Sequence, residues 1–388
     1  MSIIADNENN LLEIRTLIKK KRERLQMTQK EMSDALGMSK FGERTIRRWE
    51  NGESSPSKLE LKQILDFPEK TPFPNCAHRK YKVIDLFAGI GGTRLGFHLT
   101  GKSNFVFSSE IDKFAIKTYR ANFGEVPFGD ISKIHEKEIP NHDILVAGFP
   151  CQAFSQAGKK LGFEDTRGTL FFEIARILKF KQPKAFLLEN VKNLRNHDKG
   201  KTFKVIEKTL KELNYEVYST VLKARDFGVP QNRERIYIVG FHKELVKEYH
   251  SFLFPKPLNK KVTLGHILEK NVNPKYTISD KLWMGHQQRK SKHKNKGNGF
   301  GYTLFNQNSP YTNTISARYY KDGSEILIEQ EKLNPRKITP REAARLQGFP
   351  EEYIIPVSDT QSYKQFGNSV AVPVIHEIAK QIFKVLEK

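Results

Sequence analysis

The sequence predicts an α/β protein built on a doubly wound, mostly parallel sheet, with a smaller domain and an N-terminal all-α domain. Two observations support this fold class. Six short apolar runs, each typical of a buried strand, recur between residues 81 and 241, and helical stretches separate most of them. Residues 9–66, which precede these runs, show helical periodicity alone. A chain of 388 residues is long enough for one large core and one or two smaller units.

The predicted strands and the breaks between them divide the chain. The strands are YKVIDLF (81–87), FVFSSE (105–110), DILVAGF (143–149), AFLLEN (185–190), YEVYSTVL (215–222) and RIYIVGF (235–241). The basic run QQRKSKHKNKGNGFGY (287–302) is poor in apolar residues, and we expect a flexible, solvated surface segment there. We therefore predict a helical domain at 1–66, a linker at 67–80, an α/β domain at 81–242, an inserted domain at 243–333 and a return to the α/β domain at 334–388.

The N-terminal segment has the start and stop signals of consecutive helices. Thr28 and Glu31 are spaced as a capping box, and the helix that they begin is predicted to end at Gly37. A second helix follows and stops near Gly52, and a third covers SKLELKQIL. The next segment, FPEKTPFPNCAHRK, contains three prolines, which is typical of a linker.

The charge balance favours a polyanionic partner. Lys and Arg number 66 against 44 Asp and Glu, which gives a net charge of +22, and each phosphate that such a surface neutralises releases counterions. A generic lysine-rich surface would give the same charge balance. Charge alone therefore does not distinguish a nucleic-acid-binding protein from an ordinary basic one, and the sequence motifs are needed. No run of apolar residues is long enough to cross a membrane, and MSIIADNENN lacks the pattern of a signal peptide. Two cysteines, Cys76 and Cys151, cannot form a disulfide framework, so we expect a cytoplasmic protein.

A glycine-rich turn follows the first predicted strand. The glycines of DLFAGIGG (85–92) would let the backbone approach a nucleotide-like ligand. Glu110, at the end of the next strand, is placed to bind a pair of ribose hydroxyls. Thr93 and Arg94 break the GxGxxG spacing, which argues against a dinucleotide and leaves adenosine ligands open. A turn packed only for structural reasons is the alternative.

The third predicted strand leads into a polar loop that contains Cys151. Open α/β sheets bind ligands at this end of their strands. Most lone cysteines are buried and inert. Here the neighbours Gly148, Pro150, Gln152 and Ser155 would form a rigid polar loop, which better suits a presented thiolate.

Three charged residues lie at the ends of later strands. Glu189 follows three apolar residues, and burial there would raise its carboxyl pKa and let it donate a proton. Arg233 and Arg235 are two residues apart, on one side of a strand start. Two guanidinium groups can hold a phosphate and a base carbonyl. An ordinary surface carboxylate and surface arginines are the alternatives.

In this order, the motifs resemble those of the DNA (cytosine-5)-methyltransferase family over about residues 80–388. They are DLFAGIGG, GFPCQAFSQAG, EDTRGTLFF, LLENV, QNRERIY, RKITPREAARLQGFP and QFGNSVAVPV. The resemblance implies the S-adenosylmethionine-dependent methyltransferase fold, that cofactor with S-adenosylhomocysteine as product, and no metal. It also implies double-stranded DNA as substrate, no membrane, and a monomer that methylates a flipped-out cytosine. A cognate restriction endonuclease would act on the same site without binding the enzyme.

The resemblance also assigns roles to individual residues. Cys151 would add to carbon 6 of the cytosine, which makes carbon 5 nucleophilic. Glu189 would hydrogen-bond or protonate ring nitrogen 3, Arg235 would hold the base carbonyl, and Arg233 would support the loop. The implied cofactor-binding residues are Asp85, Phe87, Gly89, Gly91, Glu110, Ile111, Asp130, Ile131, Pro150, Leu170, Asn368, Ser369 and Val370. Many relatives carry an aromatic residue where this chain has Ile111. The implied DNA contacts beside the flipped base are Gln152, Ser155 and Arg167.

The region 243–333 would then be the target-recognition domain. Within it, TNTISARYYKDGSEILI (312–328) resembles the recognition segment of relatives that methylate the inner cytosine of CCWGG or CCNGG. The residues expected to contact DNA are Thr314, Ile315, Arg318, Tyr319, Tyr320 and Lys321. A β-hairpin with a solvated turn at Asp322 and Gly323 is the structural alternative.

The N-terminal segment resembles a phage-repressor-like helix-turn-helix domain. TQKEMSDALG followed by TIRRWENG matches its pattern, with Leu36, Gly37, Ile46 and Trp49 in the core. Arg44, Arg47 and Arg48 would lie near the exposed face of the second helix and contact DNA, and the resemblance implies a dimer on operator DNA. The turn MSKFGE is longer than usual. Some cytosine methylases with such a domain repress their own genes, although a role in packing alone is the alternative.

Two other functions fit parts of the pattern. An RNA cytosine methyltransferase would share the motifs, but relatives with that activity usually lack a DNA-binding N-terminal domain. The non-enzymatic alternative is a DNA-binding regulator with a degenerate methylase domain. The intact set Cys151, Glu189, Arg233 and Arg235 argues against it.

Overall fold

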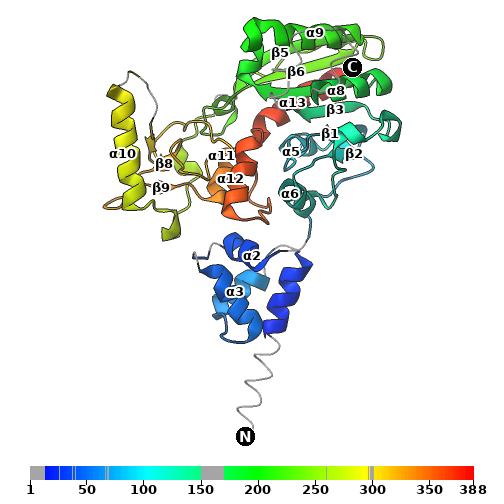
Figure 1. Ribbon diagram of the computed structural model, residues 1–388. Coiled ribbons are helices and arrows are strands. Elements are labelled where there is room, and N and C mark those ends of the chain that lie inside the picture. The colour runs from blue at the N-terminus through cyan, green and yellow to red at the C-terminus, as the bar shows by residue number, and fades with distance from the viewer. Residues whose placement is uncertain are drawn as a thin grey trace.

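The computed structural model describes residues 14–25, 27–36, 38–39, 41–65, 67, 70–149, 170–258, 260–295, 297 and 301–388. An α/β unit with a central sheet forms one end of the molecule, a smaller unit lies beside it, and a helical N-terminal unit lies at the opposite end (Figure 1). Among the helices of these residues, none is long and apolar enough to cross a membrane.

The central sheet has the order β2-β1-β3-β4-β6-β5. Its strands are β1 (Tyr81–Leu86), β2 (Ser103–Ser109), β3 (Ile144–Gly148), β4 (Ala185–Val191), β5 (Tyr215–Lys223) and β6 (Glu234–His242). Strands β2, β1, β3 and β4 are parallel, and β6 runs antiparallel to both β4 and β5. The predicted doubly wound, mostly parallel sheet is therefore confirmed, and each predicted strand overlaps an observed one.

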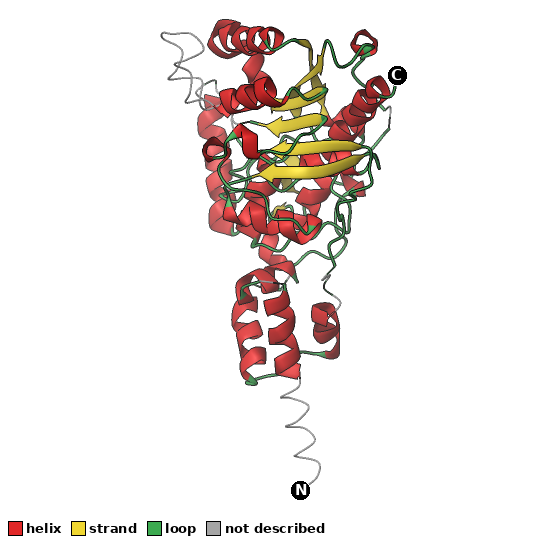
Figure 2. Ribbon diagram, turned by 90° about the vertical axis from the view of Figure 1, so that its right-hand side faces the viewer, coloured by secondary structure: helices red, strands yellow, loops and turns green. Residues whose placement is uncertain are grey.

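Helices cover both faces of this sheet (Figure 2). They are α5 (Gly92–His98), α6 (Lys113–Phe123), α8 (Leu170–Lys181), α9 (Lys201–Glu212) and α13 (Val372–Leu386). Residues of α5 and α13 share one apolar core with the sheet, and residues of α8 and α9 share the other. Because both faces are covered, the inner strands β1, β3 and β4 are mostly buried and apolar, which is why the sequence revealed them, whereas the edge strand β5 is only partly buried.

The strand order creates a crevice at one edge of the sheet. After β1 the chain moves outward to β2, and it then returns to form β3 on the opposite side of β1. The connections on either side of this switch point diverge, so the carboxyl ends of β1 and β3 border an open space. Short 3₁₀ turns at Ile131–Lys133, Glu136–Glu138, Lys192–Gly200, Ala224–Phe227, Tyr249–Ser251, Leu264–His266 and Pro274–Tyr276 join the remaining segments.

The structure of the smaller unit excludes one alternative drawn from the sequence and corrects one prediction. Its strands β7 (Leu304–Phe305), β8 (Leu327–Ile328) and β9 (Arg336–Lys337) have the order β7-β8-β9, with β8 parallel to β7 and antiparallel to β9. Residues 312–328 are therefore not a β-hairpin. The prediction of a flexible segment at 287–302 is wrong for residues 287–295, which belong to helix α10 (Asp280–Asn295). Arg289 Nη1 donates to Asp322 Oδ2 at 2.9 Å and anchors α10 beside the recognition segment.

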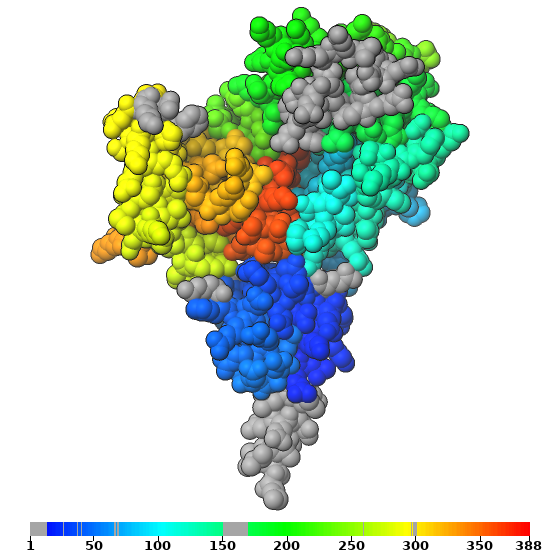
Figure 3. All heavy atoms as spheres, viewed as in Figure 1, coloured from blue at the N-terminus to red at the C-terminus, as the bar shows by residue number. Residues whose placement is uncertain are grey.

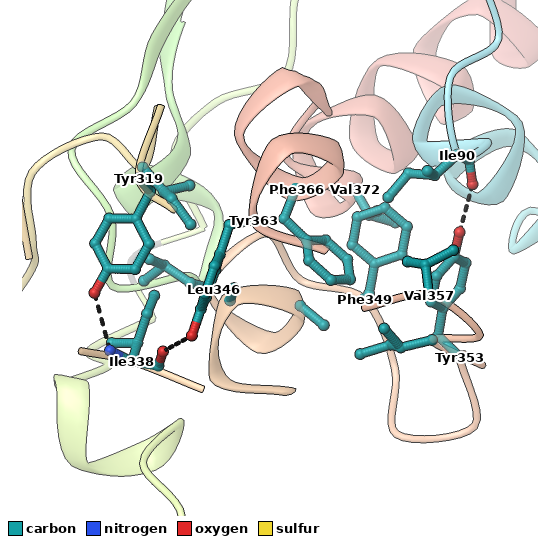
Figure 4. Packing of buried hydrophobic residues seen from close by; sticks show 14 of the residues in the cluster. Ile90, Tyr319, Ile338, Leu346, Phe349, Tyr353, Val357, Tyr363, Phe366 and Val372 are labelled. Atoms are coloured by element: carbon teal, nitrogen blue, oxygen red, sulfur yellow. Dashed lines mark hydrogen bonds between the residues drawn. The ribbon is translucent and has the colours of Figure 1, made fainter. Parts of the chain in front are cut away.

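A buried cluster joins the smaller unit to the α/β unit (Figure 4). It packs around α11 (Pro340–Leu346) and α12 (Asp359–Asn368). The Tyr353 hydroxyl donates to the Ile90 carbonyl in the turn after β1, at 2.5 Å. The Tyr363 hydroxyl on α12 donates to the Ile338 carbonyl, also at 2.5 Å. The hydrogen bond of a buried hydroxyl offsets the cost of removing it from water, so the geometry that keeps these two bonds is favoured and fixes the smaller unit against the crevice.

The N-terminal unit has its own small core. A helix covers residues 14–24 of the described chain, followed by α2 (Gln29–Ala35), α3 (Gly42–Asn51) and α4 (Lys58–Leu65). The predicted capping box is confirmed, since Thr28 and Glu31 exchange both side-chain-to-backbone bonds. Ile46 and Trp49 of α3 pack in the core, and Gly52 ends α3 in the left-handed conformation.

The connection between this unit and the sheet is packed rather than free. Phe73 is 8% exposed and stacks on Tyr353 with ring centroids 6.3 Å apart. Its backbone N–H donates to the carbonyl of Asn122 on α6 at 3.0 Å. Asn75 also donates to the Phe105 carbonyl on β2. The chain between the two units is therefore fixed on the α/β unit over the residues that precede β1.

Candidate active site

A cavity of about 440 Å³ lies at the carboxyl ends of β1, β2, β3 and β4, at the switch point of the sheet. That volume is within the usual range for a small-molecule site. The turn after β1, the start of α6, the end of β4 and the end of α12 contribute to its walls. Its charged and amide-bearing lining residues are Glu110, Asp112, Glu189, Asn190, Arg233, Arg235, Lys364, Gln365 and Asn368.

Backbone amides hold the carboxylate of Glu110 at the wall of this cavity. One oxygen accepts from Gly89 N at 2.7 Å, and the other accepts from Ile111 N and Asp112 N, both at 2.8 Å. A Cβ built on Gly89 would meet no atom within 4 Å, so the backbone there faces open space. The wall thus offers a fixed carboxylate and an accessible main chain, which suit a ligand with hydroxyl groups.

The structure brings most of the predicted cofactor residues to this cavity, but not all. Those that line it are Phe87, Gly89, Glu110, Ile111, Leu170, Asn368, Ser369 and Val370. Asp85, Gly91, Asp130 and Ile131 are not among the lining residues. A Cβ on Gly91 would lie 2.2 Å from a Phe123 ring atom, so this glycine is required by packing. Asp130 instead caps a 3₁₀ turn, where it accepts from Ser132 N at 3.0 Å.

Asp85 lies beneath the glycine-rich turn and is 1% exposed. Within the described chain its Oδ2 has no hydrogen-bond partner. Burial raises the Asp85 pKa to about 8, an effect that nearby Arg94 opposes and Glu110 increases. The neutral acid is therefore the favoured form at pH 7.

At the opposite wall, Glu189 and Arg235 form an ion pair from adjacent antiparallel strands. Their Oε1 and Nε atoms are 3.2 Å apart, and the side chains are 13% and 16% exposed. Burial raises the Glu189 pKa, although Arg235 and Arg233 both act to lower it. Gly148 lies beside Glu189 across the β3–β4 pair and leaves the space above the carboxyl group open. A carboxyl group with a raised pKa in a cavity can donate a proton or a hydrogen bond.

Arg233 holds three chain segments together behind that pair. It is 3% exposed, and its guanidinium donates to the carbonyls of Ile315, Gly367 and Ser369. Burial lowers the Arg233 pKa to about 9, helped by the charge of Arg235, so the group remains cationic at neutral pH. Its contacts are all to main-chain oxygens, so Arg233 positions the recognition segment and the end of α12.

Known proteins match this chain over both of its units. Residues 81–384 match the family of C-5 cytosine-specific DNA methylases, and residues 18–73 match a helix-turn-helix family. The chain belongs to the C-5 cytosine-specific DNA methylase family. The predicted enzyme class and the predicted helix-turn-helix domain are thereby confirmed.

Two relatives align over nearly all of this methylase. It is 71% identical over 382 residues to the Type II methyltransferase M1.ScrFI of Lactococcus lactis subsp. cremoris, with 98% of each chain covered. It is 68% identical over 374 residues to the Type II methyltransferase M.SsoII of Shigella sonnei, with 96% of this chain and 99% of the relative covered. The structure of Spodoptera frugiperda DNMT2 covers 80% of this chain and 100% of its own, with a TM-score of 0.65 at 24% identity, and shows the shared fold.

Two polar residues near the site were not predicted from the sequence. Asn190 of the methylase, beside Glu189, donates to the Phe149 carbonyl at 2.7 Å and so fixes the chain where it leaves β3. Gln231 is fully buried, accepts from Ile315 N and donates to the Leu346 carbonyl. Both residues belong to motifs recognised in the sequence, LLENV and QNRERIY. That membership could have marked them as functional residues, but it does not indicate which contacts they make.

The recognition segment of the methylase is only partly available to DNA. Ile315 and Tyr319 are fully buried, so the expectation that they contact bases is wrong. Tyr319 donates its hydroxyl to the Ile326 carbonyl at 2.6 Å and accepts from Ile338 N at 2.9 Å. Thr314 is half-buried and donates to the Asn232 carbonyl. The remaining predicted contacts, Arg318, Tyr320 and Lys321, are exposed.

Several predicted residues fall outside the described parts of the methylase: Pro150, Cys151, Gln152, Ser155 and Arg167. On α3, Arg44, Arg47 and Arg48 are exposed, as expected for side chains that contact DNA. Among the described residues, no group of three or more His, Cys, Asp or Glu could hold a metal ion.

Proposed function

We propose that this methylase transfers a methyl group from S-adenosylmethionine to carbon 5 of a flipped-out cytosine in duplex DNA. The observation that carries the proposal is the Glu189–Arg235 pair, which lies at 3.2 Å beside the cavity of a cytosine-specific methylase. A neutral or hydrogen-bonding carboxyl group and a guanidinium match ring nitrogen 3 and the adjacent carbonyl of cytosine.

The cavity wall near Glu110 fits the proposed cofactor. Its fixed carboxylate can accept from two ribose hydroxyls, and the open backbone at Gly89 leaves room for a bulky ligand. Ile111, which is 73% exposed, offers an apolar surface to an adenine ring. Of the residues predicted from the sequence, those proposed to contact the cofactor line the cavity: Phe87, Gly89, Glu110, Ile111, Leu170, Asn368, Ser369 and Val370. Pro150, which lies outside the described residues, is proposed to join them, and Asp85, Gly91, Asp130 and Ile131 are proposed only to support the walls. When bound, the cofactor supplies an electrophilic methyl group.

The side chains of the protein account for the activation of the base. The Cys151 thiolate adds to carbon 6 while Glu189 protonates or hydrogen-bonds nitrogen 3, so that the electron pair arrives at carbon 5. Arg235 holds the base carbonyl, and Arg233 keeps the surrounding segments in place. After carbon 5 gains the methyl group, it loses its proton to a base. The electron pair of that C–H bond then expels the Cys151 thiolate and restores the aromatic ring.

We propose the second cytosine of CCNGG or CCWGG as the target. Arg318, Tyr320 and Lys321 of the recognition segment are exposed and available to base edges or phosphates. The experiment is to sequence DNA from expressing cells by a method that detects 5-methylcytosine, with a Cys151→Ala strain as the control. Methylation at another sequence, such as GGCC, would refute the target but not the enzyme class.

The methylase is proposed to be the modification enzyme of a restriction–modification system, cytoplasmic and monomeric when it methylates. Two relatives named as Type II methyltransferases, each matching over at least 96% of this chain, support that setting. Its partner endonuclease would act on the same site independently. DNA from expressing cells should resist such an endonuclease, and DNA that is methylated but still cut would contradict the proposal.

A second function is supported by the helix-turn-helix match to residues 18–73. We propose that this domain binds an operator, as a dimer, and represses transcription of the methylase gene. The exposed Arg44, Arg47 and Arg48 on α3 are available to contact DNA. Footprinting of the DNA upstream of the gene tests this function, and a Cys151→Ala variant should protect it as well as the wild type does.

A further inference from the structure

We propose that the helix-turn-helix domain also supports the cofactor pocket, by docking on the two helices whose ends form part of that pocket. The inference rests on the proposed function of this pocket. Figure 3 shows the domain, in blue, in contact with the cyan-to-teal part of the α/β unit and with the orange segment near the C-terminus. Docking and cofactor binding would then strengthen one another.

The first docking contact joins α2 to α6. Lys117 Nζ on α6 donates to Glu31 Oε2 on α2 at 2.5 Å, with the side chains 21% and 10% exposed. The same Glu31 oxygen accepts from Thr28 N in the capping box. The carboxylate is thus fixed by its own helix before it meets the lysine, which reduces the entropy lost on pairing.

The second docking contact joins α2 to α12. Lys275 Nζ lies 3.0 Å from Asp359 Oδ2 at the start of α12 and 3.7 Å from Asp34 Oδ1 on α2. The Tyr276 hydroxyl also donates to Asp359, at 3.0 Å. Burial raises the Asp34 pKa, and so does the charge of Asp359, while Lys275 opposes both. Lys275 therefore holds together two carboxylates that would otherwise repel each other.

Both helices lead from these contacts to the pocket. Asp112 caps the start of α6, and Lys364 on α12 donates to it at 2.8 Å; both residues line the pocket. Between the two ends, Thr118 on α6 donates to Gln365 on α12 at 2.9 Å. Lys117 is five positions beyond Asp112, a rise of about 7.5 Å along a helix. A contact that orders these helices therefore acts within two turns of the cofactor wall.

The docking interface is loosely filled, which makes it suited to reversible coupling. Cavities of about 700 Å³ and 500 Å³ lie along it, lined by residues of both units. The two docking contacts, Lys117 with Glu31 and Lys275 with Asp34, are between charged groups, and partly exposed ion pairs weaken as salt rises. Such an interface favours docking without making it permanent, so a change at the pocket can shift it.

The test compares S-adenosylhomocysteine binding to full-length proteins by calorimetry, at low salt and at 0.5 M salt. Glu31→Gln with Asp34→Asn removes both charges, and glutamine keeps the capping box intact. Glu43→Gln with Glu53→Gln removes two exposed charges of the same domain and is the matched control. We expect the docking variant to bind about fivefold more weakly at low salt, the control to match the wild type, and high salt to reduce the difference.

A double-mutant cycle shows whether the loss passes through the contact. Lys117→Gln alone should weaken binding as Glu31→Gln alone does, and their combination should add little further. Circular dichroism and operator binding confirm that each variant is folded. If the wild type fails to bind S-adenosylhomocysteine, the proposed function is wrong. If the wild type binds but the docking variant matches the control, or the two single losses add fully, the coupling is wrong.

Discussion

Substituting alanine for Gly91 would test the packing role that the structure gives this residue. Gly91 precedes α5 with φ +78°, a conformation that costs an L-residue roughly 1–2 kcal/mol. The added Cβ would also lie 2.2 Å from the Phe123 ring, and Phe123 is 2% exposed with little room to move. Overpacking of that kind costs about 1–3 kcal/mol. The expected total is a loss of roughly 2–5 kcal/mol in the free energy of unfolding.

Gly101 provides the matched control. Its φ is +75°, but a Cβ there would meet no atom within 4 Å. Gly101→Ala should therefore lose only the conformational part, about 1–2 kcal/mol. Urea unfolding followed by fluorescence gives both values for the ligand-free protein. Equal losses in the two variants would show that the Phe123 contact does not constrain Gly91, and the packing argument would be wrong.

Three further variants probe the site and the N-terminal domain. Glu189→Gln keeps the shape of the side chain but cannot transfer a proton, so kcat should fall about 10²–10⁴-fold. Any decline of the wild-type kcat above the raised Glu189 pKa should be absent from the variant's pH profile. A fall in kcat of less than threefold would contradict the acid role. The raised Asp85 pKa means that the folded state binds a proton that the unfolded state lacks between about pH 4 and 8, so the free energy of unfolding falls as pH rises through that range. Asp85→Asn should flatten this pH dependence in thermal unfolding, and an unchanged slope would contradict the raised pKa. Arg47→Ala with Arg48→Ala should weaken operator binding by about 1–3 kcal/mol for each arginine that reads a base, measured by anisotropy, whereas methylation should remain.

The central sheet could be predicted because its signals are local. The inner strands β1, β3 and β4 are mostly buried apolar runs, and the glycine-rich turn and Glu110 lie directly at strand ends. The position of Glu189 at a central strand end was enough to predict its burial and its raised pKa. The order of the motifs supplied the chemistry, since the order follows the strands that meet at one edge.

The smaller unit and the docking of the N-terminal domain depend on distant partners. Helix α10 looked like a solvated loop because its anchor is Asp322, which is 33 residues from Arg289. The recognition segment was read as freely exposed, but Tyr319 bonds to Ile338 and is buried. Likewise, Lys117 and Glu31 are 86 residues apart and neither sequence context suggests the other. Two-residue strands such as β7, β8 and β9 carry too little pattern to be seen.

The measurement that tests the account most directly is covalent trapping on duplex DNA with 5-fluorocytosine at the target. Fluorine cannot leave carbon 5 as a cation, so a protein that has added its nucleophile to carbon 6 and transferred the methyl group stays attached. We predict a complex that forms only with S-adenosylmethionine, maps by mass spectrometry to Cys151, and is absent in Cys151→Ser and Cys151→Ala. Trapping that persists in Cys151→Ala would contradict the assigned nucleophile and the mechanism built on it.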